Sequence, residues 1–336
     1  MKTKVLKFMQ AAGAFAPFRF AHRGKALVLM YHRFSLGENG PGLPVRVFRE
    51  QLEYLTSHYQ IVPLSYLAML LNSGRPVPPR TAVITIDDAY CDAFSVAFPL
   101  LRARRIPATV FVVTGFTDRT VWIWTDKLRY LVAQVPDDVL RASLAGSPAG
   151  WASNHRLSPS NLAAALNTDM KALEDHAKDE AIAAMARRLG VTLPDTPPAG
   201  FAPIDWDQAR EMDQSVVEIG SHTATHPILT NVDAGRLERE IRESRARLED
   251  ELHRRVDLFC YPNGSLNAEV RQAVRRAGYM CAVTSNPGFN DDHSDVFALR
   301  RISTEGDLPR FIQSTSGFEH LKIRMLHGAM AARRHA

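Results

Sequence analysis

The sequence predicts an α/β protein built as a distorted barrel of the (β/α)7 type, interrupted by a helical insertion. Three observations indicate this: short apolar or β-branched runs alternate with amphipathic segments, polar residues follow several of those runs, and one central stretch has helical periodicity alone. Of the 336 residues, 46% are hydrophobic and 23% are charged. That composition supports a sizeable core and excludes a disordered or fibrous protein.

The first predicted elements are a strand and two helices. Residues 26–32 form an apolar run that ends in polar residues, which is typical of a buried strand. Apolar residues at helical spacing predict a helix over 47–58. A shorter helix is predicted over 65–72, with Ser65 as its cap.

The remaining strands alternate with helices in the same way. A β-branched run at 82–88 and an apolar run at 108–114 predict two strands with a helix to Arg105 between them. In parallel β/α folds the catalytic groups collect where the strands end, so the polar residues there are candidates for a site. The later predicted strands are 216–221, 258–262, 280–284 and 299–303, separated by helices over 233–252 and 267–277.

Residues 122–205 are predicted to be a helical insertion, because they are rich in Ala and Leu and end in the proline-rich stretch 194–203. The insertion either shapes a substrate site or is a structural elaboration. The predicted organisation is a basic segment at 1–25, a main domain at 26–121 and 206–315, the insertion at 122–205, and a basic tail at 316–336.

The net charge of +5 is concentrated at the two ends of the chain. Residues 1–25 contain six basic and no acidic residues, and residues 320–336 contain four basic and no acidic residues. The rest of the chain is therefore net acidic. This distribution argues against a nucleic-acid-binding body, and no zinc-finger spacing or RNA-binding aromatic motif is present.

The N-terminal segment allows three interpretations. Lys2, Lys4 and Lys7 precede the apolar stretch 8–18, which loosely resembles a signal peptide but is interrupted by Gln10 and Pro17. A basic amphipathic segment packed on the body is the second interpretation, and an anchor on anionic lipid is the third. We expect a cytoplasmic protein, peripheral at the inner face of the membrane, rather than a secreted one. The three cysteines, Cys91, Cys260 and Cys281, imply no disulfide framework.

Adjacent carboxylates, Asp87 and Asp88, end the predicted strand 82–88. Neighbouring negative charges repel, so the pair favours either a bound cation or a division of roles between the two side chains. The alternative is a helix N-cap, for which Asp is a preferred residue.

Two histidines follow the strand 216–221. His222 and His226 are four residues apart, so on a helical turn they would share one face and reach one metal. Two imidazoles combined with one aspartate form a ligand set that binds a divalent metal and leaves positions open for water and substrate.

A turn sequence follows the strand 258–262. Tyr261-Pro262-Asn263-Gly264 can direct a backbone N–H outward from the strand end. An ordinary strand-to-helix loop is the alternative.

These three motifs, in this order, resemble those of the polysaccharide deacetylase family, the NodB-like domain of carbohydrate esterase family 4. The resemblance covers residues 26–121 and 206–305. The chain departs from the family pattern at Ile86, which replaces the usual Phe, and at Ala89, which replaces the usual Gly. It also lacks the late L-x-x-H histidine that serves the family as a general acid.

The segment Met30-Tyr31-His32 resembles the opening strand of the poly-N-acetylglucosamine deacetylase branch, in which a histidine at this place acts as the acid. His32 fits that role, with a buried structural histidine as the alternative. Arg301 matches the branch's L-P-R-I stretch, apart from Arg300 in place of Pro. An arginine there would hold the base carboxylate ionised, and a surface or substrate-contacting arginine is the alternative.

The resemblance implies a metal-dependent hydrolase that removes N-acetyl groups from an amino sugar of a cell-envelope glycan, an exopolysaccharide or a precursor. It implies Asp87 as general base, a metal held by Asp88, His222 and His226, and oxyanion stabilisation by the N–H of Tyr261. Zn²⁺ is the expected metal, although such a set also accepts Co, Ni, Fe or Mn.

We expect Pro262, Gly264 and Trp124 to contact substrate. Further candidates for stacking on sugars are Trp122, Trp151 and Trp206, with core packing as the alternative. A metal-dependent amidase for a non-sugar C–N bond and a silent glycan-binding module are the competing functions.

Overall fold

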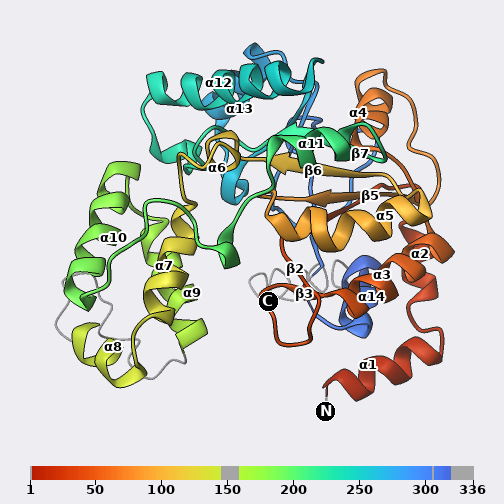
Figure 1. Ribbon diagram of the computed structural model, residues 1–336. Helices are drawn as coiled ribbons and strands as arrows, with labels where there is room; N and C mark the ends of the chain where they lie inside the picture. The colour runs from red at the N-terminus through yellow and green to blue at the C-terminus, as the bar shows by residue number, and fades with distance from the viewer. Residues whose placement is uncertain (1, 145–158, 305, 319–336) are drawn as a thin grey trace, which may run out of the picture.

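The protein is built around one curled, parallel β-sheet with helices packed outside it (Figure 1). The computed structural model describes residues 2–144, 159–304 and 306–318. The main strand order is β10-β1-β5-β6-β7-β8-β9, with β4 paired beside β5. The strands are β1 (Leu27–Tyr31), β4 (Gln60–Ile61), β5 (Thr81–Ile86), β6 (Ala108–Val112), β7 (Val217–Ser221), β8 (Leu258–Cys260), β9 (Cys281–Val283) and β10 (Ile302–Ser303).

The late segment around β10 connects the two edges of the sheet. Leu299 forms a parallel bridge with Val283 of β9, and Ile302 pairs with Leu29 of β1. The sheet therefore curls into the distorted barrel that the sequence predicts, and this fold class is confirmed. The sequence did not predict β4, nor the short pair β2 (Phe34–Ser35) and β3 (Leu43–Pro44).

The register aligns the carboxyl ends of the strands at one edge. Tyr31 pairs with Ile86, and Val112 pairs with Ser221. Residues that directly follow these four positions in the sequence therefore lie close together, although up to 190 residues separate them along the chain.

Strand alternation decides which side chains point into the barrel. Ala82, Ile84 and Ile86 pack in the larger core cluster, beneath the outer helices, whereas Val83 belongs to a second cluster that also contains Cys260. Successive side chains of a strand point to opposite faces. Thr85 and Asp87 therefore share the inner side with Val83.

The helices of the main body surround this sheet. They are α3 (Val45–His58), α4 (Leu64–Asn72), α5 (Phe98–Arg104), α6 (Thr114–Thr117), α11 (Trp206–Asp213), α12 (Ala234–Leu252), α13 (Ala268–Arg276) and α14 (Leu308–Thr315). A π-helical turn, Ala93–Ala97, precedes α5. Ser65 does not cap α4: the helix begins at Leu64 after Pro63, and the Ser65 hydroxyl donates to Glu218 instead.

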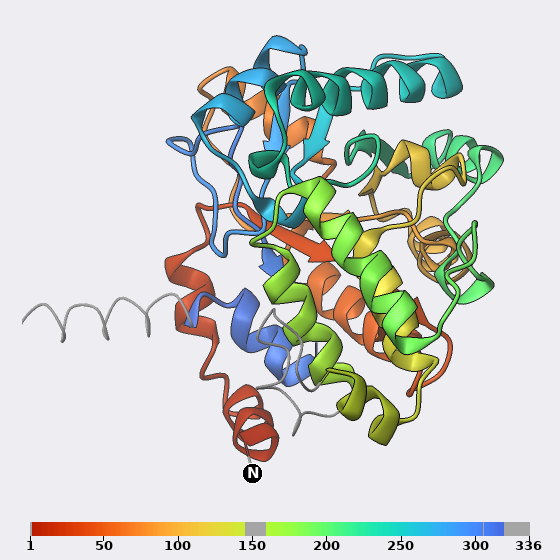
Figure 2. The same cartoon turned by 90° about the vertical axis from the view of Figure 1, so that its left-hand side faces the viewer.

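In its described residues, the segment expected to be an insertion contains four α-helices: α7 (Trp124–Ala133), α8 (Asp137–Leu144), α9 (Pro159–Met170) and α10 (Asp175–Leu189). They enclose a small core of their own. The strand arrowheads of β5 and β6 point toward these helices in Figure 1, and Figure 2 shows the helices in front of the sheet. Trp151 lies outside the described residues.

The N-terminal segment folds as α1 (Lys2–Ala11) and α2 (Ala16–Ala21), which pack against the body. Phe15 is 1% exposed and meets the Phe318 ring edge-on, with centroids 5.9 Å apart. These contacts agree with the interpretation of a packed amphipathic segment. No helix within the described ranges is both long and apolar enough to cross a membrane.

Candidate active site

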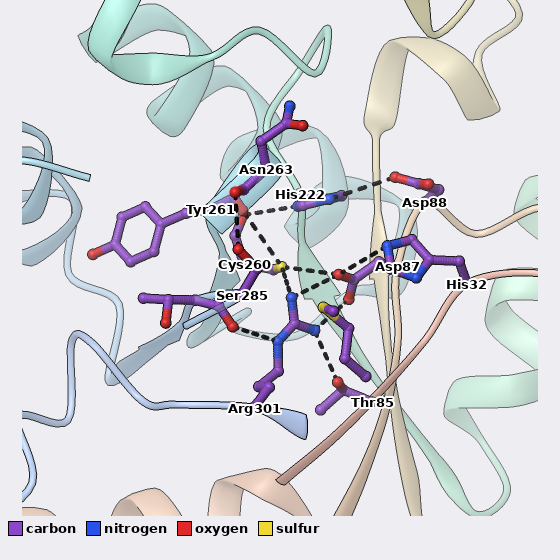
Figure 3. Close-up of polar contacts among 12 residues, drawn as sticks. His32, Thr85, Asp87, Asp88, His222, Cys260, Tyr261, Asn263, Ser285 and Arg301 are labelled. Atoms are coloured by element: carbon purple, nitrogen blue, oxygen red, sulfur yellow. Dashed lines mark hydrogen bonds and ion pairs between the residues drawn. The ribbon is translucent and has the colours of Figure 1, made fainter. Parts of the chain in front are cut away.

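A cluster of polar residues lies at the carboxyl edge of the sheet (Figure 3). His32 follows β1, Asp87 and Asp88 follow β5, and His222 follows β7. Arg301 belongs to the segment that connects the two edges of the barrel. The fold thus gathers side chains from four separate parts of the chain, as the predicted strand ends require.

Arg301 binds Asp87 with a bidentate ion pair. Its two terminal nitrogens lie 2.7 Å from the two oxygens of the Asp87 carboxylate. Further donations to the Thr284 carbonyl (2.8 Å) and the Thr85 hydroxyl (2.9 Å) orient the guanidinium. Arg301 is 1% exposed and Asp87 is 2% exposed. Arg301 is therefore neither a surface residue nor positioned only to contact substrate.

The electrostatic effect of this pair favours an ionised Asp87. Burial by itself would raise the pKa of the Asp87 carboxyl, but the charge of Arg301 and its hydrogen bonds outweigh burial and lower the pKa. A carboxylate that stays ionised inside a barrel can accept a proton, which is the requirement for a general base.

Asp88, His222 and His226 form a second, adjacent group. The Nε2 atoms of His222 and His226 lie 3.5 Å and 3.4 Å from Oδ1 of Asp88. All three side chains are buried, and their candidate ligand atoms lie within 4.8 Å of one another. Oδ1 of Asp88 has no hydrogen-bond partner in the described structure.

These observations fit a divalent cation. Nδ1 of His222 is 2.8 Å from the Cys260 carbonyl oxygen, so a proton on Nδ1 leaves the Nε2 lone pair directed at the shared centre. Burial lowers the pKa of His226 to about 4, which keeps its imidazole neutral, as a metal ligand must be. Burial alone would also lower the pKa of His222, but Cys260 and Asp88 outweigh burial and raise that pKa, so a cation has to displace a proton from this imidazole when it binds. A buried carboxylate oxygen without a partner is costly unless a ligand satisfies it.

The two histidines do not lie on a helical turn, as the sequence suggested. Thr223 and His226 have φ angles of 70° and 60°, so the chain forms an irregular loop with two left-handed residues. Side chains support this loop: the Thr223 hydroxyl accepts from the His226 N–H (3.0 Å). Such backbone strain persists only where the surroundings hold it, and it is common at functional sites.

Glu240 of α12 also holds this loop. Its carboxylate accepts from the backbone N–H groups of Ala224 (3.0 Å) and Thr225 (2.8 Å), and from the Thr225 hydroxyl. Arg236 connects Glu240 (3.6 Å) to Asp175 of the insertion (2.6 Å). No sequence pattern predicts this role for Glu240, because a glutamate in an amphipathic helix is usually a solvated residue.

The alternative in which the Asp87-Asp88 pair caps a helix is wrong. Neither carboxylate accepts a helix N–H within the described structure, and Asp88 has a left-handed φ of 69°. Ala89 follows with a φ of 56°, the conformation that the family's usual Gly adopts freely. The alanine keeps this conformation at a cost of about 1 kcal/mol.

His32 lies beside Asp87. Its Nε2 is 3.8 Å from Oδ2 of Asp87, and Figure 3 shows it approaching Asp87 from the side opposite to Arg301. The side chain is 42% exposed. His32 is therefore not a buried structural histidine, and solvent can exchange its proton.

The turn after β8 differs from its predicted role. The N–H of Tyr261 donates to the Val283 carbonyl (3.2 Å), because Tyr261 still follows the parallel β8–β9 ladder. This N–H is therefore not free to stabilise an oxyanion, contrary to the expectation. The Tyr261 ring is buried, and its hydroxyl donates to the Phe297 carbonyl (3.0 Å). Pro262 and Gly264 are buried in the turn, and their contact with substrate stays a prediction.

Cys260 is also part of the site. Its Sγ lies 3.5 Å from Oδ2 of Asp87 and 3.2 Å from a terminal nitrogen of Arg301. It belongs to the motif at the end of strand 258–262, but no role was predicted for it. Strand alternation places it on the inner face of β8, beside Asp87.

The insertion reaches the site through buried contacts. Ile228, two residues after His226, packs in the core of the insertion with Trp124. Trp124 is 3% exposed, and the Lys178 ammonium lies 4.8 Å from its ring centroid. This placement favours core packing, so substrate stacking by Trp124 stays a prediction. Trp122 is also buried, and Trp206 donates to Asp118 (2.8 Å).

A curled parallel β/α sheet with a buried carboxylate and a candidate cation-ligand group at its carboxyl edge defines a β/α barrel with a site at its strand ends. The chain belongs to the polysaccharide deacetylase family, whose model matches residues 74–282. The NodB-like resemblance predicted from the three motifs is thereby confirmed. The protein is a hydrolase of the C–N bond in N-acetylated sugars.

Individual relatives agree with this assignment. YxkH of Bacillus subtilis (strain 168), provisionally assigned as a polysaccharide deacetylase, is 21% identical over 279 residues, which cover 83% of this chain and 71% of YxkH. A shorter match of 71 residues at 32% identity links the chain to the poly-beta-1,6-N-acetyl-D-glucosamine N-deacetylase of Escherichia coli (strain K12). That match spans 21% of this chain and 11% of the Escherichia coli protein.

Two solved structures share the fold. The Streptococcus pyogenes deacetylase PplD, in complex with acetate, superposes with a TM-score of 0.58 at 19% identity, covering 87% of this chain and 98% of PplD. IcaB from Ammonifex degensii gives a TM-score of 0.57 at 19% identity, covering 87% and 97% of the two chains. At this identity the likeness shows the fold.

Proposed function

We propose that the protein removes N-acetyl groups hydrolytically from an N-acetylated amino sugar of a cell-envelope glycan, an exopolysaccharide or a precursor, with a divalent metal bound. One observation carries the proposal. Asp87, paired with Arg301, lies 3.8 Å from His32 and directly precedes Asp88 of the group Asp88, His222 and His226, so that the proposed base, acid and cation ligands meet at one edge. The name of the Escherichia coli relative, which refers to poly-beta-1,6-N-acetyl-D-glucosamine, supports a GlcNAc-type substrate.

Asp88, His222 and His226 would hold the ion, and zinc suits two imidazoles and a carboxylate with open positions. When bound, such an ion polarises the acetamide carbonyl and makes a nearby water more acidic. These three ligands are distinct from Asp87, which accepts hydrogen bonds from Arg301 and remains available as a base.

Asp87 and His32, which lie side by side, then divide the proton transfers. Asp87 takes a proton from the water that attacks the acetamide carbon. His32, protonated from solvent, gives a proton to the nitrogen as the C–N bond breaks, because an amide anion is a very poor leaving group. The products are acetate and a free amino sugar, and the protons balance between the two groups.

The proposal predicts acetate release from N-acetylglucosamine oligomers by the metal-loaded protein. Asp87→Asn should lower kcat by roughly 10²- to 10⁴-fold, as the loss of a general base does, while metal content stays unchanged. His222→Ala should lose the metal. Asp250→Asn, at a side chain that is 79% exposed, is the matched control and should behave as the parent protein.

Three readouts test the roles separately: acetate by coupled assay, metal content by atomic emission, and product mass. Chelation should abolish acetate release and added Zn²⁺ should restore it. Near-normal turnover of His32→Ala would remove His32 from the role of acid. Release of acetate that persists in Asp87→Asn would overturn the assignment of the base.

A further inference from the structure

A basic groove lies at the end of the molecule opposite to the site. It has a volume of about 490 Å³ and is formed by α2, the end of α3 and the residue that precedes β5. Arg80 directly precedes β5, whereas Asp87 directly follows it. The groove therefore lies at the amino ends of the strands. Figure 1 shows α1 and α2 at the right and the insertion at the left.

The charged side chains that line this groove are basic. Arg19, Arg23 and Arg80 line it together with His22 and His58, and no acidic residue is among its lining. Arg19 donates to the Tyr54 hydroxyl (3.2 Å). Within the described ranges, none of the three arginines has an ion pair with a carboxylate. Three guanidinium groups gathered in a groove whose lining contains no carboxylate form a site for an anion.

The backbone holds the groove in place. The N–H of Arg80 donates to the Arg23 carbonyl (2.7 Å), which ties the end of α2 to the start of β5. Arg23 in turn lies 3.8 Å from the centroid of the Phe20 ring. The arginines are thus presented from a rigid part of the fold.

Exposed apolar side chains surround the same end. Of the seven large hydrophobic side chains that are exposed in the described part of the chain, three lie in α1 and α2: Val5 (53%), Phe8 (75%) and Phe20 (64%). Val5 and Phe8 are three residues apart and share one face of α1. Lys4 and Lys7 are exposed beside them.

We propose that this end of the molecule docks on an anionic phospholipid bilayer, with a lipid phosphate in the groove and Phe8 and Phe20 in the interfacial region. Charge complementarity favours this occupant over an uncharged surface, and the exposed aromatic side chains favour a bilayer over a soluble phosphate. The docked protein has the carboxyl edge of its sheet turned away from the lipid. The inference is independent of the proposed function.

The test is co-sedimentation of the full chain with vesicles of phosphatidylcholine, with or without about one third phosphatidylglycerol. The parent protein should bind only the anionic vesicles. Arg23→Gln/Arg80→Gln should weaken binding roughly 30-fold, because each basic side chain near such a surface contributes ~1 kcal/mol. Arg187→Gln/Arg239→Gln removes the same charge from exposed positions elsewhere and should change binding less than about 3-fold.

A second comparison tests the apolar contacts. Phe8→Ser should weaken vesicle binding, whereas Val139→Ser, at an exposed residue of the insertion, should not. If the two arginine double variants lost affinity for anionic vesicles equally, the groove would be ruled out as the docking site. Absence of binding to anionic vesicles, or its complete reversal by millimolar inorganic phosphate, would overturn docking on a bilayer. Acetate release from a soluble oligomer is measured in parallel, so a failure of the catalytic proposal is seen separately.

Discussion

Replacement of Arg301 by methionine is the most informative perturbation of this site. Methionine fills much of the same volume but removes both hydrogen bonds to Asp87 and those to Thr284 and Thr85. Asp87 is 2% exposed, so its charge is left buried without a counter-ion. Breaking a buried ion pair in this way costs about 3–5 kcal/mol of unfolding free energy at neutral pH.

The cost should depend on pH with a definite sign. In the parent protein the pKa of Asp87 is lowered by folding, so its ionisation stabilises the fold above the unfolded pKa of about 3.9, and this contribution is lost at lower pH. Without Arg301, burial dominates and raises the pKa of the folded state above that of the unfolded chain. The Arg301→Met variant is then less stable than the parent protein at neutral pH, and this difference in unfolding free energy disappears as pH falls and Asp87 is protonated.

Urea unfolding of both proteins between pH about 4 and about 8 measures this difference. The stability gap should be largest at neutral pH and should shrink toward acid, and the acid limb of the kcat/KM profile should move to higher pH. Arg276→Met is the control, because Arg276 pairs with Glu238 at the surface and is 49% exposed. Such a pair contributes less than about 1 kcal/mol. The reasoning would be refuted if the difference in unfolding free energy between the parent protein and Arg301→Met did not change with pH. It would also be refuted if that difference were as small as the one for Arg276→Met.

Two further variants test the supporting structure. Glu240→Ala removes the acceptor of two backbone N–H groups in the histidine loop and should weaken metal binding by about 10- to 100-fold in competition with a chromophoric chelator. Glu238→Ala, on the same helix, should leave that affinity unchanged, and equal affinities in the two variants would contradict the bracing role. Gly264→Ala should lower the unfolding free energy, measured by urea denaturation, by more than about 1 kcal/mol. The reason is that φ of Gly264 is +68° and that a Cβ there would lie 2.3 Å from the Ser285 nitrogen. Gly200→Ala, with open space around it, is the control, and a Gly264 variant as stable as this control would show that the turn can relax.

Much of the fold was predictable because its signals are local. The seven predicted strands correspond to β1, β5, β6, β7, β8, β9 and β10. An apolar run bounded by polar residues reflects burial in a parallel sheet, which any short window of sequence reveals. The two-residue strands β2, β3 and β4 were missed, because pairs this short have no periodicity.

The loops of the site were harder to predict than its residues. Spacing alone suggested a helical turn for His222 and His226, whereas Thr223 and His226 adopt left-handed angles. Their conformation depends on hydrogen bonds that the loop donates to Glu240, which lies 14 residues further along the chain than His226. A backbone held by a distant side chain has no local signature.

By itself, the sequence determined which residues are chemically suited to the reaction: paired carboxylates and histidines at the ends of apolar runs. Only the tertiary structure decided how they work together. The closing segment of the barrel carries Arg301 to Asp87 across 214 residues of sequence, and the β8–β9 ladder engages the Tyr261 N–H. The physical reason is that burial and hydrogen-bond partners, which set the protonation state of a carboxylate and the availability of an N–H, arise from contacts between distant parts of the chain.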